Sequence, residues 1–304
     1  MGLRRFLILI TIAIVILLII VVWFFPSDRD FRTDNPFWNG TKDIGSSYPA
    51  APIESLSELP ASPQGSTLIL IPYLNFTSAE LEALNGFVAK GGSLILADDY
   101  GYGNQILEYL GLKARFSGQT LLDPLVNYKN KWFPKIFNLK PSPFTSNTDS
   151  LVLNYATCLI GVNTDDTLAL SSLFSFLDLN DNQVWDKPES TGPLPVISHH
   201  NLGSGQIILI ADPSIFINSM ESMEGNRNFI QNIVTATTSS LLIDQSHLPS
   251  TELHQTKNIL THIRDTLATP LGTIGLLVLA LTITLSPIWH KRTTNPTLKG
   301  DESD

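Results

Sequence analysis

The chain has 304 residues, a formal net charge of −9 and one cysteine, Cys158. The negative charge argues against nucleic acid and against anionic lipid surfaces as partners, because both are polyanionic. A single cysteine excludes an internal disulfide, so core packing must hold the folded part together. Cys158 lies within an apolar run, which favours a structural thiol over a nucleophile.

Residues 6–25 form the first predicted element, a transmembrane helix. The stretch is almost wholly Ile, Leu, Val and aromatic, and Thr11 is its only polar member. About 20 apolar residues in a helix span a bilayer core of ~30 Å. The alternative is a cleaved signal peptide, whose apolar core has roughly 7–15 residues and ends at a small-residue cleavage site. This run is longer and ends at Trp23-Phe24-Phe25-Pro26, so we expect an uncleaved anchor.

A second transmembrane helix is predicted over residues 267–289. No charged residue occurs in this stretch, although Thr, Pro and Gly dilute it. Membrane helices tolerate these residues where backbone groups find partners. A buried core helix is the alternative, but Trp289 and the basic run His290-Lys291-Arg292 are typical of a membrane interface.

Basic residues beside both spans predict the topology. Arg4 and Arg5 precede the first span, and Lys291 and Arg292 follow the second. Because basic flanks stay in the cytoplasm, we expect residues 1–5 and the tail 290–304 to be cytoplasmic. The body of the chain then lies outside the cytoplasm, at the cell membrane.

Residues 26–64 are rich in Pro, Ser, Asn and Gly, which predicts a linker that leads into the domain and contributes nothing to its core. An α/β domain is predicted over residues 65–247, because short apolar runs alternate with amphipathic patterns. The runs lack polar alternation, which is typical of a mostly parallel sheet with helices on both faces. An amphipathic helix over residues 248–266 leads into the second span.

The predicted strands of this domain occupy residues 67–71, 93–97, 151–162, 167–170, 194–198, 206–211 and 240–244. The predicted helices occupy residues 78–90, 104–111 and 223–235. Ser78 is the expected N-cap of the first helix, and Gly91-Gly92 is its expected end. Residues 116–149 show little periodicity and are expected to form an insertion or a long loop.

Three motifs, in this order, resemble those of a known family. They are FVAKGGSLILADDYGYGN from Phe87 to Asn104, GSGQIILIADPSIFIN from Gly203 to Asn218, and LIDQSH from Leu242 to His247. The chain resembles the membrane-anchored family that carries the domain of unknown function numbered 4350, over about residues 35–247. The flanking spans agree with the layout of that family.

The resemblance implies a flavodoxin-like fold of the class I glutamine amidotransferase type. It does not imply amidotransferase chemistry, which needs a low-pKa cysteine at a strand-to-helix elbow. The elbow positions, Pro72-Tyr73 and Asp99-Tyr100, offer no thiol. Genes of this family often lie near chaperone ATPases and other membrane proteins, which implies by analogy an assembly partnership with membrane or envelope proteins.

Residues 178–189 match the spacing of an EF-hand calcium loop, which places oxygen ligands at positions 1, 3, 5, 7, 9 and 12. The expected ligands are Asp178, Asn180, Asn182, the Val184 carbonyl, Asp186 and Glu189. Gln183 replaces the usual glycine, and no helix plainly follows Pro188. The alternative is a solvated acidic turn, because Asp and Asn are turn formers.

Four acidic side chains lie at the ends of three of the predicted strands. They are Asp98, Asp99, Asp212 and Asp244. Ligands of open parallel sheets bind beyond the carboxyl ends of the strands, so these residues are expected to converge. The candidate catalytic residues are Asp99, Asp212, Asp244 and His247, and the candidate ligand-binding residues are Asp99, Gly101, Gly103, Asn104, Asp212, Ser214 and Asn218. The alternative is that the acidic residues cap the following helices, and Asp98 in particular is expected to be structural.

Three functions follow from these patterns. The first is a non-catalytic, membrane-tethered domain that binds a ligand or a partner protein. The second is an exported hydrolase that uses Asp244, His247 and neighbouring carboxylates. The third is a calcium-stabilised structural module of the cell envelope.

Overall fold

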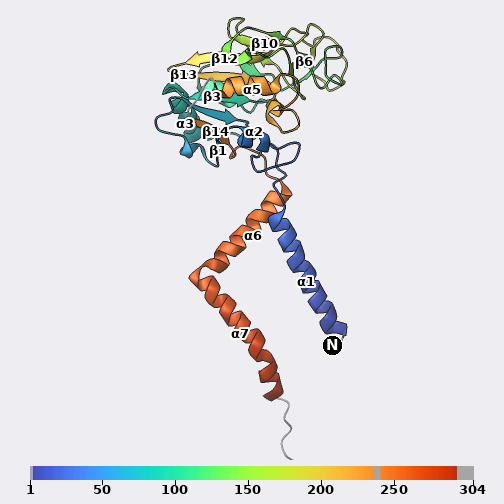
Figure 1. Cartoon of the computed structure of the whole chain (residues 1–304), viewed down its shortest axis with the longest axis vertical. Coiled ribbons are helices and arrows are strands. Elements are labelled where there is room, and N and C mark those ends of the chain that lie inside the picture. The colour runs from blue at the N-terminus through green and yellow to red at the C-terminus, as the bar shows by residue number, and fades with distance from the viewer. Residues whose placement is uncertain (1–2, 236–239, 293–304) are drawn as a thin grey trace, which may run out of the picture. The chain divides into compact units, whose positions relative to one another are not determined.

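A computed structural model describes residues 3–235 and 240–292 of the chain. The chain divides into two compact units (Figure 1). One is an α/β unit, Pro26–Thr251. The other is a helical unit that combines Met1–Phe25 with Glu252–Asp304.

An eight-stranded mixed sheet forms the centre of the α/β unit. Its order is β1 (Ala50–Ile53), β14 (Ser240–Asp244), β2 (Ser66–Leu70), β3 (Ser93–Ala97), β13 (Gly205–Ile210), β12 (Pro195–Leu202), β10 (Thr167–Leu170) and β7 (Asn138–Leu139). The first five strands run parallel, and the last three pair antiparallel. The prediction of a large, mostly parallel sheet is confirmed, while the antiparallel half was not predicted.

Short strands outside the central sheet form three two-stranded ladders. They are β4 (Arg115–Phe116) with β9 (Leu159–Ile160), β5 (Thr120–Leu122) with β11 (Phe176–Asp178), and β6 (Lys135–Ile136) with β8 (Leu151–Val152). Residues 116–149 thus have short strands and turns in place of long elements, as their weak periodicity predicts.

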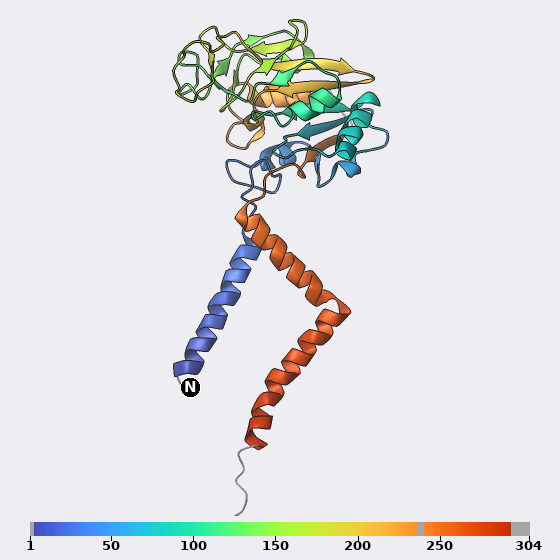
Figure 2. The same ribbon diagram turned by 180° about the vertical axis from the view of Figure 1, so that it is seen from behind.

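Helices cover both faces of the central sheet. Helix α5 (Asn226–Thr235) lies over one face, and α3 (Ser78–Ala89) and α4 (Asn104–Tyr109) lie over the other (Figures 1 and 2). The remaining short helices of this unit are α2 (Lys42–Ser47) and the 3-10 helices η1 (Leu56–Glu58), η2 (Pro143–Thr145) and η3 (Pro213–Phe216).

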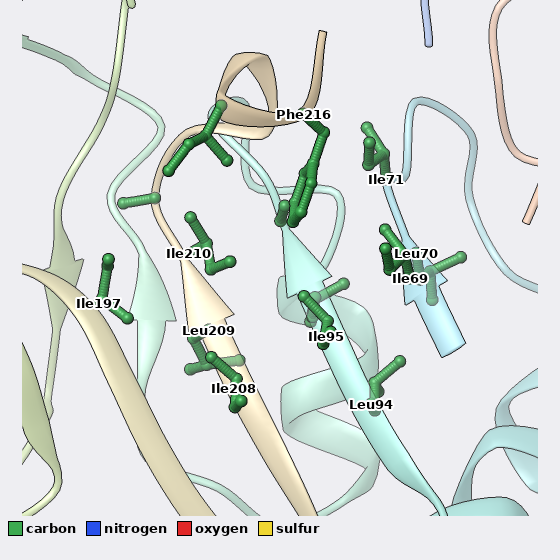
Figure 3. Close-up of a cluster of buried hydrophobic side chains, with 14 of the residues drawn as sticks. Ile69, Leu70, Ile71, Leu94, Ile95, Ile197, Ile208, Leu209, Ile210 and Phe216 are labelled. Carbon is green, nitrogen blue, oxygen red and sulfur yellow. The ribbon is translucent and has the colours of Figure 1, made fainter. Parts of the chain in front are cut away.

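The core lies where the parallel strands are covered on both faces. Every residue of β2 and β3 is buried. Their Leu and Ile side chains pack with those of β13 and with Phe216 (Figure 3). Because a fully buried Leu or Ile contributes about 1.5–3 kcal/mol, this layer fixes the register of the strands. It thereby fixes the positions of the residues that follow their carboxyl ends.

Three local predictions differ from the structure. The run 151–162 is not one strand, because Asn154 donates its N–H to Asp212 and Tyr155 has a φ of 52°, which separates β8 from β9. Helix α3 is capped by Thr77 rather than by Ser78, and Thr77 and Glu80 form a reciprocal capping box. The predicted strand 194–198 extends to Leu202, because its backbone continues to pair with β13 up to the turn before Gly205.

The segment 26–64 was predicted to lie outside the core, but it contributes to the α/β unit. Strand β1 is the edge of the central sheet and pairs in parallel with β14. Phe31 and Ile44 are buried. The composition of the segment reflects turns around these few buried positions.

The helical unit contains α1 (Leu3–Phe24), α6 (Glu252–Ala268) and α7 (Pro270–Arg292). Among the described residues, one helix is long and apolar enough to act as a membrane span or a signal anchor, namely Phe6–Phe24. The second predicted span lies within α7, whose side chains are described only in part, so this span stays a prediction. Residues 1–2 and 293–304 of the predicted cytoplasmic ends lie outside the described residues.

Candidate functional site

The carboxyl ends of β2, β3 and β13 bring one set of acidic and aromatic side chains together. Ile210 of β13 pairs with Ala97 of β3, so Asp98 and Asp212 follow neighbouring strands. Tyr73 follows β2, which lies between β14 and β3 in the sheet. Its N–H donates to the His247 carbonyl at 2.9 Å. Asp98 and Asp212 therefore lie at the same edge of the sheet.

Asp98 is a structural residue. Its buried carboxylate accepts hydrogen bonds from the N–H groups of Tyr100 at 2.9 Å, Gly101 at 2.9 Å and Gly103 at 2.6 Å. Gly101 has a φ of +95°, which favours glycine, and an added Cβ at Gly103 would lie 3.1 Å from Asp98 Oδ2. Both glycines therefore shape the turn around Asp98.

Asp99 differs from its neighbour because its carboxyl is not used by the backbone turn. Its Oδ1 atom is shielded from solvent and has no hydrogen-bond partner among the described residues, while the side chain as a whole is only partly buried. Burial, followed by repulsion from Asp212 and Asp98, raises the pKa of Asp99 to about 8. Asp99 is thus the candidate residue whose hydrogen-bonding capacity remains unfilled.

Asp212 lies beside Asp99 and is fully buried. It caps η3 by accepting the Ser214 N–H at 2.7 Å, and it accepts the Asn154 N–H at 2.6 Å. Burial raises the pKa of Asp212 to about 7, although these two hydrogen bonds favour the ionised form. Burial therefore raises the pKa values of both carboxyls above their usual range.

Two tyrosines interact electrostatically with this pair of carboxyls. Tyr73 and Tyr100 meet edge to face at 5.7 Å, and Phe31 stacks on Tyr73 at 5.6 Å. Burial and the Asp99 carboxyl raise the pKa values of both tyrosines, so both remain neutral phenols. Tyr100 is 65% exposed and offers a ring face at the surface. We call Tyr73, Asp99, Tyr100 and Asp212 the acidic-aromatic site.

Asp244 and His247 form a separate pair at the end of β14. Asp244 Oδ2 lies 2.9 Å from His247 Nδ1, and His247 Nε2 lies 3.6 Å from Glu80 Oε1. The His247 ring is almost entirely buried and stacks on Phe76 at 4.2 Å. The arrangement joins β14 to the start of α3, and a carboxylate rather than a nucleophile faces Nε2.

The hydrolase prediction requires Asp99, Asp212 and His247 to act on one substrate. Among the described residues, no hydrogen bond joins any two of these three side chains. Three cavities are described, lined by residues around α3, around β7 and β10, and around Tyr48, and none of the three includes these side chains. The hydrolase remains a prediction.

Two predicted ligand-binding asparagines contact backbone groups. Asn104 Nδ2 donates to the Phe116 carbonyl at 2.9 Å, and its Oδ1 accepts the Phe116 N–H at 2.8 Å. Asn218 Nδ2 donates to the Phe37 carbonyl at 2.6 Å, and its Oδ1 accepts the Asp43 N–H at 3.0 Å. Both side chains therefore stabilise neighbouring loops through hydrogen bonds to their backbone.

The acidic and amide side chains of the predicted calcium loop form hydrogen bonds with groups of the same loop. Asp186 accepts hydrogen bonds from the amides of Asn180 and Asn182, and Glu189 accepts the N–H groups of Leu179 and Asp186. Asp178 is buried and accepts two further backbone N–H groups, and the Val184 carbonyl belongs to the same loop. Within the part of the chain that the structure describes, no group of three or more His, Cys, Asp or Glu side chains is placed to hold a metal ion.

Cys158 is fully buried, and this burial raises the pKa of its thiol to about 12. A thiol with so high a pKa is not a nucleophile at neutral pH. The sequence correctly predicted a structural thiol.

Sequence reasoning missed Tyr73, Tyr100 and Glu80 as members of these clusters. Tyr73 and Tyr100 were noted only as elbow positions without a thiol. The same rule that selected the aspartates, a position just beyond a parallel strand, selects both tyrosines. Glu80 had no such signal, because its distance to His247 depends on how α3 packs.

Comparisons with known proteins give one family match. Residues 37–234 match the model of the family described as "Domain of unknown function (DUF4350)". No curated protein matches the chain.

Solved structures resemble parts of the chain at low identity. The mmIFT52 N-terminal domain has a TM-score of 0.43 and 13% identity, and the match covers 57% of this chain and 77% of that one. A beta-galactosidase from Bacillus circulans sp. alkalophilus has a TM-score of 0.37 and 14% identity, covering 58% and 23%. A thua-like protein from Bacteroides uniformis has a TM-score of 0.33 and 15% identity, covering 61% and 73%. These similarities assign no function.

Proposed function

Because the chain belongs to the DUF4350 family, we propose that it is a membrane-anchored binding domain without catalytic activity. We further propose that its sheet is of the flavodoxin-like, amidotransferase-like type. The acidic-aromatic site binds a cationic group, an ammonium or a guanidinium, of a partner molecule. Other membrane or envelope proteins are the proposed source of that group.

A single observation supports this function most strongly. Asp98, Asp212, Asn104 and Asn218 bond to backbone groups of their own chain, whereas Asp99 has an oxygen with no partner among the residues that the structure describes. An unpaired buried acceptor costs about 1–3 kcal/mol. A ligand that supplies a donor to this carboxyl would recover part of that cost, so the site favours binding.

The chemistry of the site favours a cation. Two neighbouring carboxyls with raised pKa values become easier to ionise when a positive charge lies beside them. The exposed face of Tyr100 adds a cation–π surface. A guanidinium suits both features, because it can bond a carboxylate with two N–H groups while it stacks on a ring. Catalysis is not proposed, because no activated nucleophile accompanies the carboxyls within the described part of the chain.

The anchoring part of the proposal rests on the apolar helix Phe6–Phe24. We propose that it remains uncleaved and that α7 forms a second span. The basic residues beside the two helices support cytoplasmic termini and a domain outside the cytoplasm.

Calorimetric titration with agmatine, which carries a guanidinium and an ammonium, tests the binding site. We expect the full-length wild-type protein to bind it, and we expect Asp99→Asn to weaken binding by about tenfold or more, which corresponds to ~1.4 kcal/mol. The control Glu108→Gln removes an exposed charge from α4 and should bind as wild type does. Equal affinity of wild type and Asp99→Asn would contradict the assignment.

A second proposal concerns the loop 178–189, which we propose binds Ca²⁺ and stabilises the α/β unit. Its support is the spacing of Asp178, Asp186 and Glu189 in the sequence, which matches an EF-hand loop, while in the structure these carboxylates accept N–H groups of their own loop. Binding requires Asp178 and Glu189 to exchange backbone N–H partners for the ion. The loop is thus a site that calcium would reorganise.

Millimolar calcium is expected to raise the melting temperature of the full chain relative to excess chelator. At a calcium concentration tenfold above Kd, the expected stabilisation is about 1.4 kcal/mol. Asp186→Asn keeps the shape of the side chain and should reduce the gain. A melting temperature that calcium leaves unchanged would end this proposal.

A further inference from the structure

A third carboxylate borders the acidic-aromatic site. Asp30 is exposed, and the next residue, Phe31, stacks its ring on Tyr73 at 5.6 Å. Tyr73 in turn meets Tyr100 edge to face at 5.7 Å. Burial raises the pKa values of both phenols, and Asp99 and then Asp30 raise them further. The carboxyls of Asp30 and Asp99 therefore lie close to the same two rings.

The negative charge of Asp30 is not compensated by the basic residues beside it. Arg29 donates its guanidinium to the carbonyls of residues 248–249, at 2.8 Å and 3.0 Å. Arg32 forms ion pairs with two other carboxylates. Among the described residues, no cation forms an ion pair with Asp30, and its Oδ2 atom has no hydrogen-bond partner. Asp30 is therefore available to a positive group from outside the chain.

An exposed aromatic ring belongs to the turn that contacts Asp30. Asn39 donates its side-chain amide to Asp30 Oδ1, and the preceding residue, Trp38, is 68% exposed. The face of an indole is the best aromatic surface for a cation. Asp30 and Trp38 thus repeat the combination of a carboxylate and an exposed ring that Asp99 and Tyr100 present.

We infer that the ligand of the acidic-aromatic site carries two positive charges, one held at Asp99 and the other at Asp30. The inference rests on the proposed function, to which it adds the second charge. An apolar spacer joins the two charges, because methylene groups can pack along the rings that lie near both carboxyls. A free small dication and an Arg with a nearby Lys on a partner protein share this chemistry.

The second contact is exposed, so it should contribute selectivity more than affinity. An exposed ion pair typically changes an affinity by a small factor, and salt screens it. The Asp99 contact is shielded from solvent at Oδ1, so it should supply most of the binding energy. The ligand is therefore distinguished from a monocation by a modest, salt-dependent preference.

Calorimetry on the full chain with agmatine and with n-pentylguanidine tests this preference. The two molecules have the same guanidinium and the same chain length, but pentylguanidine ends in a methyl group where agmatine has an ammonium. At low salt we expect the wild-type protein to bind agmatine about threefold more tightly than pentylguanidine. Asp30→Asn retains the acceptor for Asn39, and it should abolish the preference without weakening pentylguanidine. The control Glu108→Gln removes an exposed charge from α4 and should keep the preference.

An unchanged preference in Asp30→Asn would overturn the inference. The proposed function would still stand in that case, provided that pentylguanidine binding depends on Asp99. Failure of both molecules to bind the wild-type protein would overturn the inference and the proposed function together.

Salt dependence provides a measurement on the wild-type protein alone, which serves if Asp30→Asn folds poorly. Raising the salt concentration from about 0.01 M to about 1 M shortens the screening length from about 30 Å to about 3 Å. The preference for agmatine should then fall towards equal affinity. A preference that salt leaves unchanged would contradict an exposed second contact.

A capped Arg-Ala-Lys peptide distinguishes the two sources of the charges. Binding that is tighter than that of agmatine and is weakened in Asp30→Asn would assign the charges to a partner protein. Binding weaker than that of agmatine would assign them to a free small dication. Either result supports the second charge, because both depend on Asp30.

Discussion

Asp98→Ala is expected to lower the free energy of unfolding of the α/β unit by about 3–5 kcal/mol. The substitution leaves the N–H groups of Tyr100, Gly101 and Gly103 without the carboxylate that they share. Each unsatisfied buried donor costs about 1–3 kcal/mol, and removing the buried charge offsets part of the sum. Urea unfolding of the full chain, followed by tryptophan fluorescence, measures the loss.

Asp98→Asn is the matched variant for this prediction. It retains one acceptor oxygen at the same place and should lose about half as much stability as Asp98→Ala. A variant Asp98→Ala that unfolds at the wild-type urea concentration would show that the turn does not depend on the carboxylate.

Asp99→Asn is expected to act in the opposite direction, and only at higher pH. The folded pKa of Asp99, about 8, exceeds its ordinary value, so the folded state holds a proton that the unfolded state releases. The wild-type protein should therefore lose stability as the pH rises from about 4 to about 8. Asn carries no charge, so the variant should be more stable than wild type by about 1–3 kcal/mol at pH 8, allowing for the partial exposure of the side chain.

Urea unfolding at pH 5 and at pH 8 measures this difference. Near pH 5 Asp99 is protonated in the folded state, so most of the difference between the two proteins should disappear. Asp212 remains in the variant and continues to titrate, so some pH dependence should persist. Identical pH profiles of wild type and Asp99→Asn would contradict the raised pKa.

The sequence predicts the parallel part of the fold well because its strands are buried on both faces. The runs of β2, β3, β13 and β14 contain hardly any polar residue, so composition and length identify them. Strand β1 (Ala50–Ile53) was not predicted from the sequence, because four residues that include a proline resemble a linker. Its pairing with β14 is a long-range contact without a local signal.

The run 151–162 shows a second limit. Its apolar residues are buried, as predicted, but β8 and β9 bury them in two different ladders. The separation depends on the hydrogen bond from Asn154 to Asp212, which joins distant parts of the chain. Hydropathy alone does not contain that information.

The candidate site was predictable in position but not in detail. The rule on strand ends placed Asp99 and Asp212 together, and the structure brings them to neighbouring strands. The rule did not distinguish the role of Asp98 from that of Asp99. Asp98 accepts three backbone N–H groups, and Asp99 accepts none of these three. That difference depends on which way the turn after β3 folds.

The pH dependence of agmatine binding tests the central claim most directly, namely that the Asp99–Asp212 pair binds a cation. Both carboxyls must ionise to attract it, and their pKa values are about 8 and about 7. Calorimetry on the full chain should therefore show affinity that rises by about tenfold or more between pH 6 and pH 8.5. Affinity that is independent of pH over this range, or equal in Asp99→Asn, would contradict the account.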